Sequence, residues 1–185
     1  MFGGGSEQED SRRVDTTLFG SARQQVSLTG PDTEKLSAFL RSAASNDVLL
    51  SGERISPLHH ELEAVKFMHF AVVPVVSLGI ERHHEADELV VRIDDGHVRL
   101  NGRLSRSSSI EGTNTVRWRQ IGDGQWSFET DIDLTLKLRI PWMPRPALRA
   151  WQATGSAVLS AACKRNARRL LRDVSEAHAA WEPPA

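Results

Sequence analysis

Two pairs of adjacent histidines are the first residues in this sequence that suggest metal chemistry. The pairs are His59-His60 and His83-His84, and both fall in segments whose pattern predicts strands or loops. Adjacent residues of a strand point to opposite faces, so neither pair can close on one ion. No cysteine pair and no HExxH spacing accompanies them. We therefore predict no metal site and interpret these histidines as solvated.

Three further features could indicate catalysis, and each has a simpler explanation. Cys163 falls in a helical pattern without a sequence-adjacent helper, and free cysteine is commonly a buried packing residue. The segment TGSAV lacks the GxSxG elbow of hydrolases. Asp131 and Asp133 resemble paired carboxylates, but their parity places them opposite the apolar face of a strand. The sequence thus predicts no catalytic residue and no cofactor.

Basic residues gather without acids in the last third of the chain. Between Pro146 and Arg172 there is no Asp or Glu. Cations near the end of a helix favour its dipole, so a solvated face is the simplest interpretation. The alternative is docking on an anionic membrane surface or an acidic protein, each basic residue adding up to about 1 kcal/mol near such a lipid surface. The residues that would form this docking surface, the C-terminal ridge, follow three-and-four spacing and are Arg165, Arg168, Arg169 and Arg172.

Length and composition indicate one ordinary globular domain. The chain has 185 residues, 39% apolar and 25% charged, and its formal net charge of −1 gives no argument for nucleic acid. No apolar run approaches the roughly 20 residues of a transmembrane span. The single cysteine excludes an internal disulfide and suits a reducing intracellular compartment such as the cytoplasm.

Residues 1–22 are predicted to form a disordered tail, and residues 23–182 a single domain. The tail is glycine-rich and polar, without the apolar core of a signal peptide. Its acids Glu7, Glu9 and Asp10 argue against an intact organelle transit sequence.

Within the domain, hydrophobic periodicity separates two helices from a run of strands. Leu36, Phe39 and Leu40 share one face of the first helix. We expect this helix to end at Asn46 and Asp47. Glycine-containing turns are predicted at 94–96 and 122–124, and a loop at 106–114. The predicted helices cover residues 31–45 and 146–180, and the strands cover 23–30, 53–55, 58–68, 70–80, 88–93, 98–104, 115–121 and 125–140.

The last two strands constrain each other's register. Apolar residues of 125–140 occupy even positions, as Trp118 does in the preceding strand. A three-residue loop at 122–124 would pair Ile121 with Gln125 and place Trp118 opposite Phe128. A slip of one residue would turn every side chain to the wrong face, so we predict this register.

The final helix carries one continuous apolar stripe with a narrow middle. Gly155 and Ala162 either let the helix press closely on a sheet or leave space there. Glycine costs about 1 kcal/mol in a helix interior, so Gly155 should have a packing reason. The residues of the stripe are Leu148, Trp151, Gly155, Val158, Leu159, Ala162, Leu170, Val174, Ala177 and Trp181.

This order of elements resembles the helix-grip, or START-like, superfamily. The resemblance implies an α+β fold in which a curved antiparallel sheet of about six to seven strands wraps a long C-terminal helix, with a short helix after the first strand. Such folds often keep an apolar cavity between sheet and helix. A lipocalin-like barrel is the alternative fold, but it would need neither the early helix nor so long a terminal one.

A narrower resemblance covers residues 26–181. The segments LTGPDTEKLSAFLRS, FAVVPVVSLGI and LRIPWMPRPALRAWQATGSAVLSAACKRNARRLL, with the final Trp181, are similar to an uncharacterised family of cyanobacteria and plastid-bearing eukaryotes. In that family a proline sits inside the mid-chain apolar strand, and prolines introduce a last helix containing a glycine. The family has no established reaction, so it implies no catalytic residue.

Two hypotheses about function follow. The first is a non-catalytic module that binds an apolar or amphipathic small molecule, such as a lipid or pigment, or presents its surface to a protein. The alternative is a cyclase-like enzyme, which should place titratable groups with perturbed pKa values in its cavity. The cavity-facing side of 125–140 offers only Thr130 as a polar group, so binding is favoured.

The predicted ligand site lies between the last strand and the last helix. If Gly155 and Ala162 leave space, the cavity beneath them should measure roughly 300–1,000 Å³, the usual range for ligand sites. The predicted lining residues are Trp118, Phe128, Thr130, Leu134, Leu136, Leu138, Trp151, Gly155, Val158 and Ala162.

Overall fold

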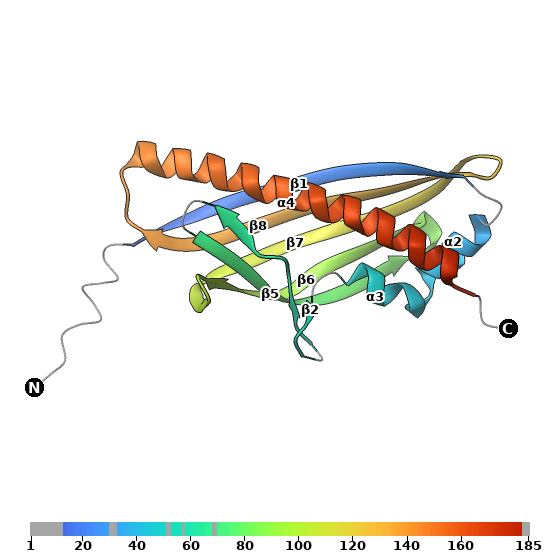
Figure 1. Ribbon diagram of the computed structural model, residues 1–185, viewed down its shortest axis with the longest axis horizontal. Helices are drawn as coiled ribbons and strands as arrows, with labels where there is room; N and C mark the ends of the chain where they lie inside the picture. The colour runs from blue at the N-terminus through green and yellow to red at the C-terminus, as the bar shows by residue number, and fades with distance from the viewer. Residues whose placement is uncertain (1–12, 30–32, 51–52, 57, 68–69, 183–185) are drawn as a thin grey trace, which may run out of the picture.

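A curved antiparallel sheet wraps one long helix, α4, which runs along the length of the molecule (Figure 1). The computed structural model describes residues 13–29, 33–50, 53–56, 58–67 and 70–182, with the backbone alone at residues 33, 34, 67, 104 and 106. Within these residues the sheet has eight strands in the order β1-β8-β7-β6-β5-β3-β2, and β4 pairs with β5. The predicted helix-grip fold is therefore confirmed, with a sheet slightly larger than expected.

All strands of the described residues belong to this one sheet. Their bounds are β1 Arg13–Thr29, α2 Thr33–Arg41, the 3-10 helix η1 Ala43–Ser45, α3 Asn46–Leu49, β2 Glu53–Arg54, β3 His60–Glu61, β4 Val65–Phe67, β5 Phe70–His83, the 3-10 helix η2 His84–Ala86, β6 Glu88–Leu100, β7 Arg103–Gly122, β8 Gln125–Pro141 and α4 Arg145–Ala180.

β8 lies between β1 and β7 in the sheet, and its alternating sequence places its side chains as predicted. The even-numbered side chains of β8 face the core, and all except Leu134 are buried. Trp118 of β7 lies opposite Phe128, as predicted. The turn differs in detail, because Gly122 rather than Ile121 pairs with Gln125. A two-residue turn combined with a bulge at Ile121 thus produces the register expected of a three-residue loop.

β1 begins at Arg13, so the prediction of a disordered tail is wrong for residues 13–22. The strand pairs with β8 along its whole length, from Arg13 opposite Pro141 to Thr29 opposite Gln125. Thr16, Leu18 and Gly20 form its buried face. Only one of these three is a large apolar residue, so the alternation is weak in the sequence. The remainder of the predicted tail, residues 1–12, lies outside the described residues.

The middle of the sheet departs from the predicted strand boundaries. Residues 94–96 do not turn; they lie inside the continuous strand β6, and the predicted loop at 106–114 belongs to β7. A Cβ at Gly96 would lie 2.5 Å from the Ile110 carbonyl oxygen, so this glycine allows β6 and β7 to approach closely. The hairpin turn lies instead at Asn101-Gly102, where φ is 49° and 80°. Both positive values suit an Asn-Gly turn.

The predicted strand at 58–68 is also interrupted, since it forms the two short strands β3 and β4. Between them the chain stays attached to the sheet through the Leu62 N–H, which donates to the Pro74 carbonyl at 2.9 Å. Pro74 itself has no N–H to donate to this segment, whereas its pairing with Val98 of β6 continues the β5–β6 ladder.

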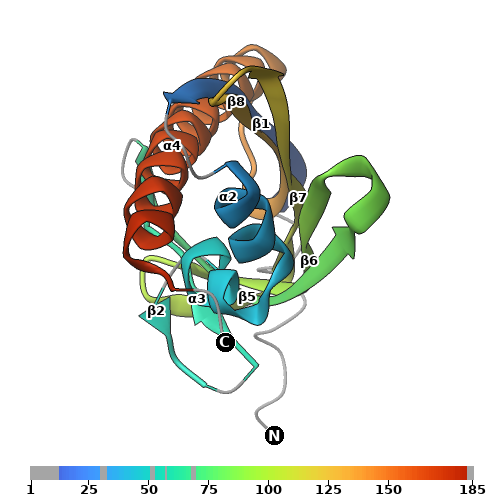
Figure 2. The ribbon, with the colours of Figure 1, turned by 90° about the vertical axis from the view of Figure 1, so that its right-hand side faces the viewer.

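Short helices fill one end of the curved sheet (Figure 2). Leu36, Phe39 and Leu40 of α2 are buried, as predicted. Asn46 starts the further helix α3 instead of ending the helical region. Arg82 of β5 connects the sheet to these helices. It donates to the Leu40 carbonyl of α2 at 3.2 Å and to Asn46 Oδ1 of α3 at 2.5 Å.

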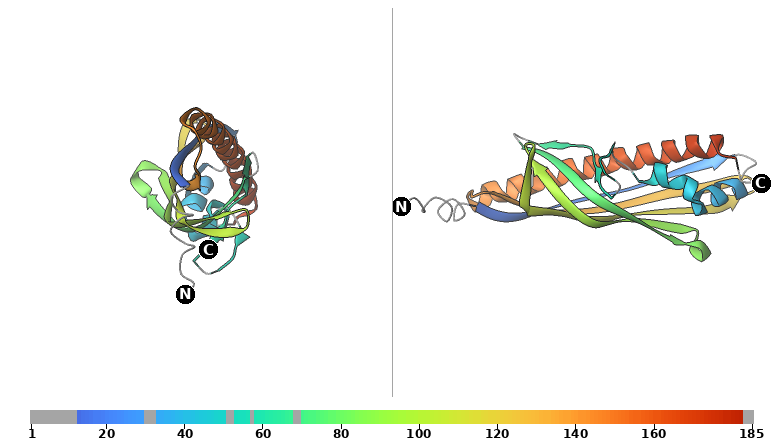
Figure 3. Two further views of the ribbon diagram at one scale, coloured as in Figure 1. Left: turned by 90° about the vertical axis from the view of Figure 1, so that its left-hand side faces the viewer. Right: turned by 90° about the horizontal axis from the view of Figure 1, so that it is seen from below.

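α4 lies against β1 along the long axis of the molecule (Figure 3). The N–H groups of Phe19 and Ser21 donate to the hydroxyls of Ser156 and Ser160, at 3.1 and 3.4 Å. Gln152 Nε2 of the same helix donates to a β1 side chain, Thr16 Oγ1, at 2.9 Å. β1 ends the sheet order, and an unprotected edge strand invites pairing with other chains. The helix therefore covers this edge with hydrogen-bonding groups of its own.

Candidate functional site

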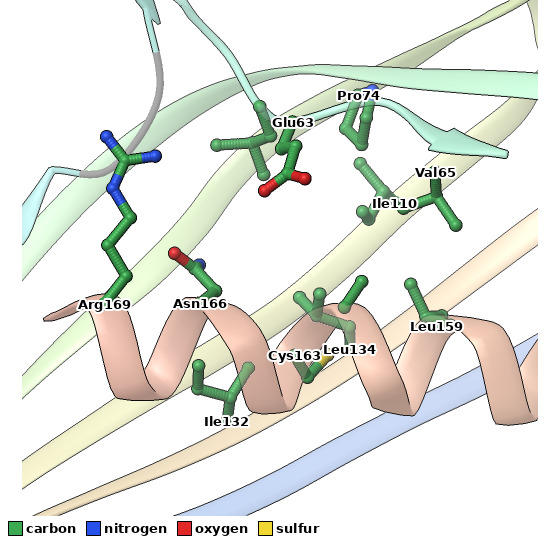
Figure 4. A pocket seen from close by; sticks show the side chains of 12 residues that line it. Glu63, Val65, Pro74, Ile110, Ile132, Leu134, Leu159, Cys163, Asn166 and Arg169 are labelled. Carbon is green, nitrogen blue, oxygen red and sulfur yellow. The ribbon is translucent and has the colours of Figure 1, made fainter.

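A small cavity of about 90 Å³ lies between the middle of α4 and the sheet (Figure 4). Its walls come from the segment before β4 and from β4, β5, β7, β8 and α4. The apolar lining consists of Leu62, Val65, Pro74, Ile110, Ile132, Leu134, Leu159, Ala162 and Cys163. Three polar side chains complete it: Glu63, Asn166 and Arg169.

The space exists because small residues surround Leu134. Its partners on the two neighbouring strands are both glycines, Gly20 on β1 and Gly112 on β7. A Cβ at Gly112 would meet Leu134 Cδ2, so the leucine side chain leans over this glycine. The helix lines the space with the small side chains of Ala162 and Cys163, while Leu159 of α4 packs over Gly20. Because the two glycines and Ala162 leave volume unfilled beside Leu134, the core is incomplete there.

Larger clusters of buried side chains pack on both sides of the cavity. One, beneath α2 and the end of α4, contains Trp118 and Phe128. The other, beneath the first half of α4, contains Leu136 and Trp151. The cavity lies where β8 passes from one cluster to the other, so the predicted ligand site is mostly packed core.

Only two of the predicted ligand-site residues, Leu134 and Ala162, line this cavity. Leu138 belongs to the second cluster and Val158 packs against it. Gly155 is buried on α4 but does not line the cavity. At about 90 Å³ the cavity is smaller than the expected range of roughly 300–1,000 Å³. It can hold a short apolar group rather than a whole lipid.

The polar groups of Thr130 and Trp118, two residues of the predicted site, form hydrogen bonds within the fold. Thr130 is fully buried, and its hydroxyl donates to Asn114 Oδ1 at 2.5 Å. Trp118 Nε1 donates to the Ser37 hydroxyl of α2 at 3.2 Å. Both side chains therefore stabilise the fold, and a contact of either with a ligand stays a prediction.

The polar side chains gather toward one end of the cavity. Figure 4 shows Arg169, Asn166 and Glu63 on one side, and Val65 and Leu159 toward the other. Sequence reasoning missed Glu63 and Asn166. Asn166 lies one helical turn after Ala162, so the stripe could have revealed it. Glu63 could not be found in this way, because its segment breaks the predicted strand.

Cys163 faces the cavity, but its chemistry does not suit a nucleophile. Burial raises the pKa of its thiol to about 11, and the negative charge of Asp133 acts in the same direction. The thiolate is the reactive form, so at neutral pH this group is nearly all unreactive thiol. The structure agrees with the interpretation of Cys163 as a packing residue.

The histidine pairs differ in exposure, and the interpretation of these histidines as solvated is wrong for His60. His60 is buried in β3, while His59 contacts the Ser56 hydroxyl through Nδ1 at 3.1 Å. His83 and His84 are both exposed. Among the described residues no group of three or more His, Cys, Asp or Glu side chains could hold a metal ion.

His60 should make the protein less stable in mildly acidic solution. Burial, with a smaller contribution from the positive charge of Arg54, lowers the pKa of the His60 imidazole below 6.5. Just below that pH the unfolded chain binds a proton that the folded chain does not, so the free energy of unfolding should fall with pH. We expect a lower urea midpoint at about pH 5.5 than at about pH 7, and a smaller difference in His60→Leu. An equal pH dependence in the variant would contradict this prediction.

The C-terminal ridge is exposed but partly neutralised. Arg169 Nε and Arg172 Nη2 contact the carboxylate of Asp173 at 3.3 and 3.0 Å, and Arg172 lies 3.8 Å from Glu176. Arg168 Nε contacts Gln24 Oε1 at 3.4 Å. Docking through this ridge stays a prediction, and two of its four guanidinium groups already contact acids.

Comparisons with known proteins add little beyond the fold. No family model matches the sequence, and no curated protein matches it. Similar solved structures include norcoclaurine synthase from Thalictrum flavum, with 5% identity, TM-score 0.46, and coverage of 100% of this chain and 98% of that one. Another is an aromatase/cyclase from a Streptomyces species, with 13% identity, TM-score 0.40, and coverage of 86% and 93%.

A START superfamily protein from Mycobacterium smegmatis has 11% identity and TM-score 0.33, over 81% of this chain and 98% of that one. Similarities this low concern the fold and not the function. The narrower resemblance to a cyanobacterial and plastid family stays a prediction. Within the described part of the chain, no helix has the length and hydrophobicity to cross a membrane.

Proposed function

We propose that this protein is a binding module for an amphipathic small molecule. The apolar end of the ligand, such as the end of an acyl or isoprenoid chain, enters the cavity beside Leu134 and Ala162. Its polar end stays at the rim with Glu63, Asn166 and Arg169. The observation that supports this proposal is an apolar cavity with polar side chains gathered toward one end.

The size of the cavity limits what part of the ligand is buried. About 90 Å³ accommodates a few carbon atoms, so most of a lipid or pigment would remain outside or enter only if the walls move. The segment that carries Glu63 is the wall best able to move, because it lies between two short strands rather than inside one. Moderate affinity is the expected consequence of so little buried apolar surface.

Catalysis by a cyclase-like enzyme has less support from the same residues. Cys163 is held as a thiol, as described above. Of the described residues that line the cavity, Glu63 is the carboxylate, and it is exposed to solvent. A general acid or base usually gains its function from burial or a neighbouring charge. Glu63 lacks the burial that would favour such a role, and an exposed carboxylate suits contact with a polar headgroup.

Filling the cavity should remove ligand binding without unfolding the protein. Ala162→Leu adds three carbon atoms that the cavity can accept, whereas Ala161→Leu adds the same atoms on the exposed face of α4. We expect Ala162→Leu to weaken binding at least about tenfold, because the apolar end of the ligand loses its space. Ala161→Leu should bind like the wild type.

Methyl-resolved NMR of the full chain, titrated with fatty acids, alcohols and amines of about six to twelve carbons, measures this binding. Ligand entry should shift the methyl signals of Val65, Ile110 and Leu134. If no chain length shifts these signals, the proposal fails. It also fails if Ala162→Leu stays folded and binds as tightly as Ala161→Leu. If Ala162→Leu loses its folded spectrum, α4 cannot move to accept the larger side chain. Leu134→Ala, which enlarges the cavity, then tests the proposal: it should bind ligands with longer chains than the wild type binds.

A further inference from the structure

Trp142 is a large aromatic side chain exposed to solvent at one end of the molecule. It lies between β8 and α4, and 65% of its surface is accessible. Trp118, Trp126 and Trp151 are buried by comparison. Pro141 and Pro144 flank the short link that carries Trp142 and restrict its backbone. This end lies opposite the one where α2, α3 and the end of α4 meet (Figure 1).

Three arginines lie close to Trp142 along the chain or across the sheet. Arg13 pairs in the sheet with Pro141, the residue before Trp142. Arg145 and Arg149 follow on the first turns of α4, one turn apart, and all three arginines are exposed. Among the described residues no ion pair joins any of the three to an acid. We refer to Arg13, Trp142, Arg145 and Arg149 together as the Trp142 tip.

The fold does not explain these charges. Cations stabilise the C-terminal end of a helix, and they are unfavourable near its N-terminus, where the dipole is positive. Arg145 and Arg149 lie at that N-terminal end, and the first turn of α4 contains no acid. The ridge arginines differ in this respect, because they lie in the second half of α4 and Arg169 and Arg172 contact Asp173.

We propose that the Trp142 tip docks the protein on an anionic lipid surface. Tryptophan favours the headgroup region of a bilayer, where its ring is partly buried and its N–H stays hydrated. Arg13, Arg145 and Arg149 would contact phosphate and carboxylate groups of the lipids around it. The combination of an exposed aromatic ring with arginines that form no ion pair within the described residues distinguishes this surface from the ridge. The proposal does not depend on ligand binding in the cavity.

Vesicle binding of the full chain tests the proposal. The vesicles contain phosphatidylcholine alone or with about 30% phosphatidylserine, at about 0.05 M and about 0.3 M salt. We expect binding to the anionic vesicles at low salt and weaker binding at high salt. Arg145→Gln with Arg149→Gln should reduce partitioning by roughly fivefold for each arginine removed. Trp142→Ala should reduce it by roughly five- to tenfold, since the inserted apolar surface is lost.

Two matched controls separate this tip from general charge and exposure. Arg165→Gln with Arg168→Gln removes the same charge from the C-terminal ridge. Ile121→Ala shortens an apolar side chain that is 49% exposed and lies near the C-terminal end of β7. Both should bind vesicles like the wild type or nearly so. Brominated acyl chains should quench the fluorescence of the wild type and quench Trp142→Phe much less.

Several results would overturn the proposal. One is an absence of wild-type binding to anionic vesicles at low salt. Another is binding that the ridge variant loses and the tip variant keeps, which would make the ridge the docking surface. Equal losses in the two double variants, with Trp142→Ala unchanged, would mean that net charge alone attracts the protein.

Discussion

Leu136→Ala should lower the free energy of unfolding by about 2–5 kcal/mol. Leu136 is 1% exposed and lies opposite Leu18 on β1 and Ile110 on β7, both of which are buried too. Truncation would leave a void in the middle of three strands beneath α4, where the backbone cannot collapse to fill it. Urea denaturation followed by circular dichroism measures the change.

Lys137→Ala is the matched control for Leu136→Ala. Its side chain is exposed on the opposite face of β8 and forms an ion pair with Glu111. Exposed pairs of this kind contribute little, so we expect a loss of less than about 1 kcal/mol. If both variants lost the same free energy of unfolding, the even-numbered face of β8 would not be buried. The packing of the sheet against α4 would then be contradicted as well.

Gly20→Ala should destabilise the protein by about 1–3 kcal/mol, the usual cost of overpacking. A Cβ at this position would lie 2.5 Å from Leu159 Cγ and 3.1 Å from the backbone carbonyl carbon of Leu159. The helix would have to move away from β1. That movement would lengthen the contacts of Ser156 and Ser160 with the β1 edge, so amide exchange at Phe19 and Ser21 should become faster.

Gly122→Ala provides the comparison for Gly20→Ala. The nearest atom to a Cβ there is Gln125 Oε1 at 3.5 Å, an ordinary contact. Its free energy of unfolding should stay within about 0.5 kcal/mol of the wild type. If Gly20→Ala were as stable as Gly122→Ala, the close approach of α4 to β1 would not exist in solution.

The sequence by itself determined the two elements with the strongest periodicity. β8 alternates over most of its length, and α4 carries a stripe from Leu148 to Trp181, so each could be placed within a few residues. The pairing of Trp118 with Phe128 also followed, because a shift of one residue would expose every apolar side chain. The helix-grip fold was therefore predictable from local patterns and their order.

The tertiary structure decided where neighbouring segments meet. Asp94, Asp95 and Gly96 have the composition of a turn, yet Gly96 is a glycine because β7 passes close to it. The true turn, Asn101-Gly102, carried an equally local signal that sequence reasoning passed over. For β1 the decisive contacts come from β8 and α4, far away in the sequence, and a weakly apolar segment does not reveal them.

The candidate site was the least predictable part for the same physical reason. Periodicity tells which side chains face inward, but it does not tell which inward-facing side chains fill the space between them. The cavity depends on Leu134 meeting glycines on both neighbouring strands, with Ala162 and Cys163 of α4 lining the same space, so four elements must come together. Leu134 and Ala162 were found because they belong to periodic elements, whereas Glu63 was brought to the rim only by folding.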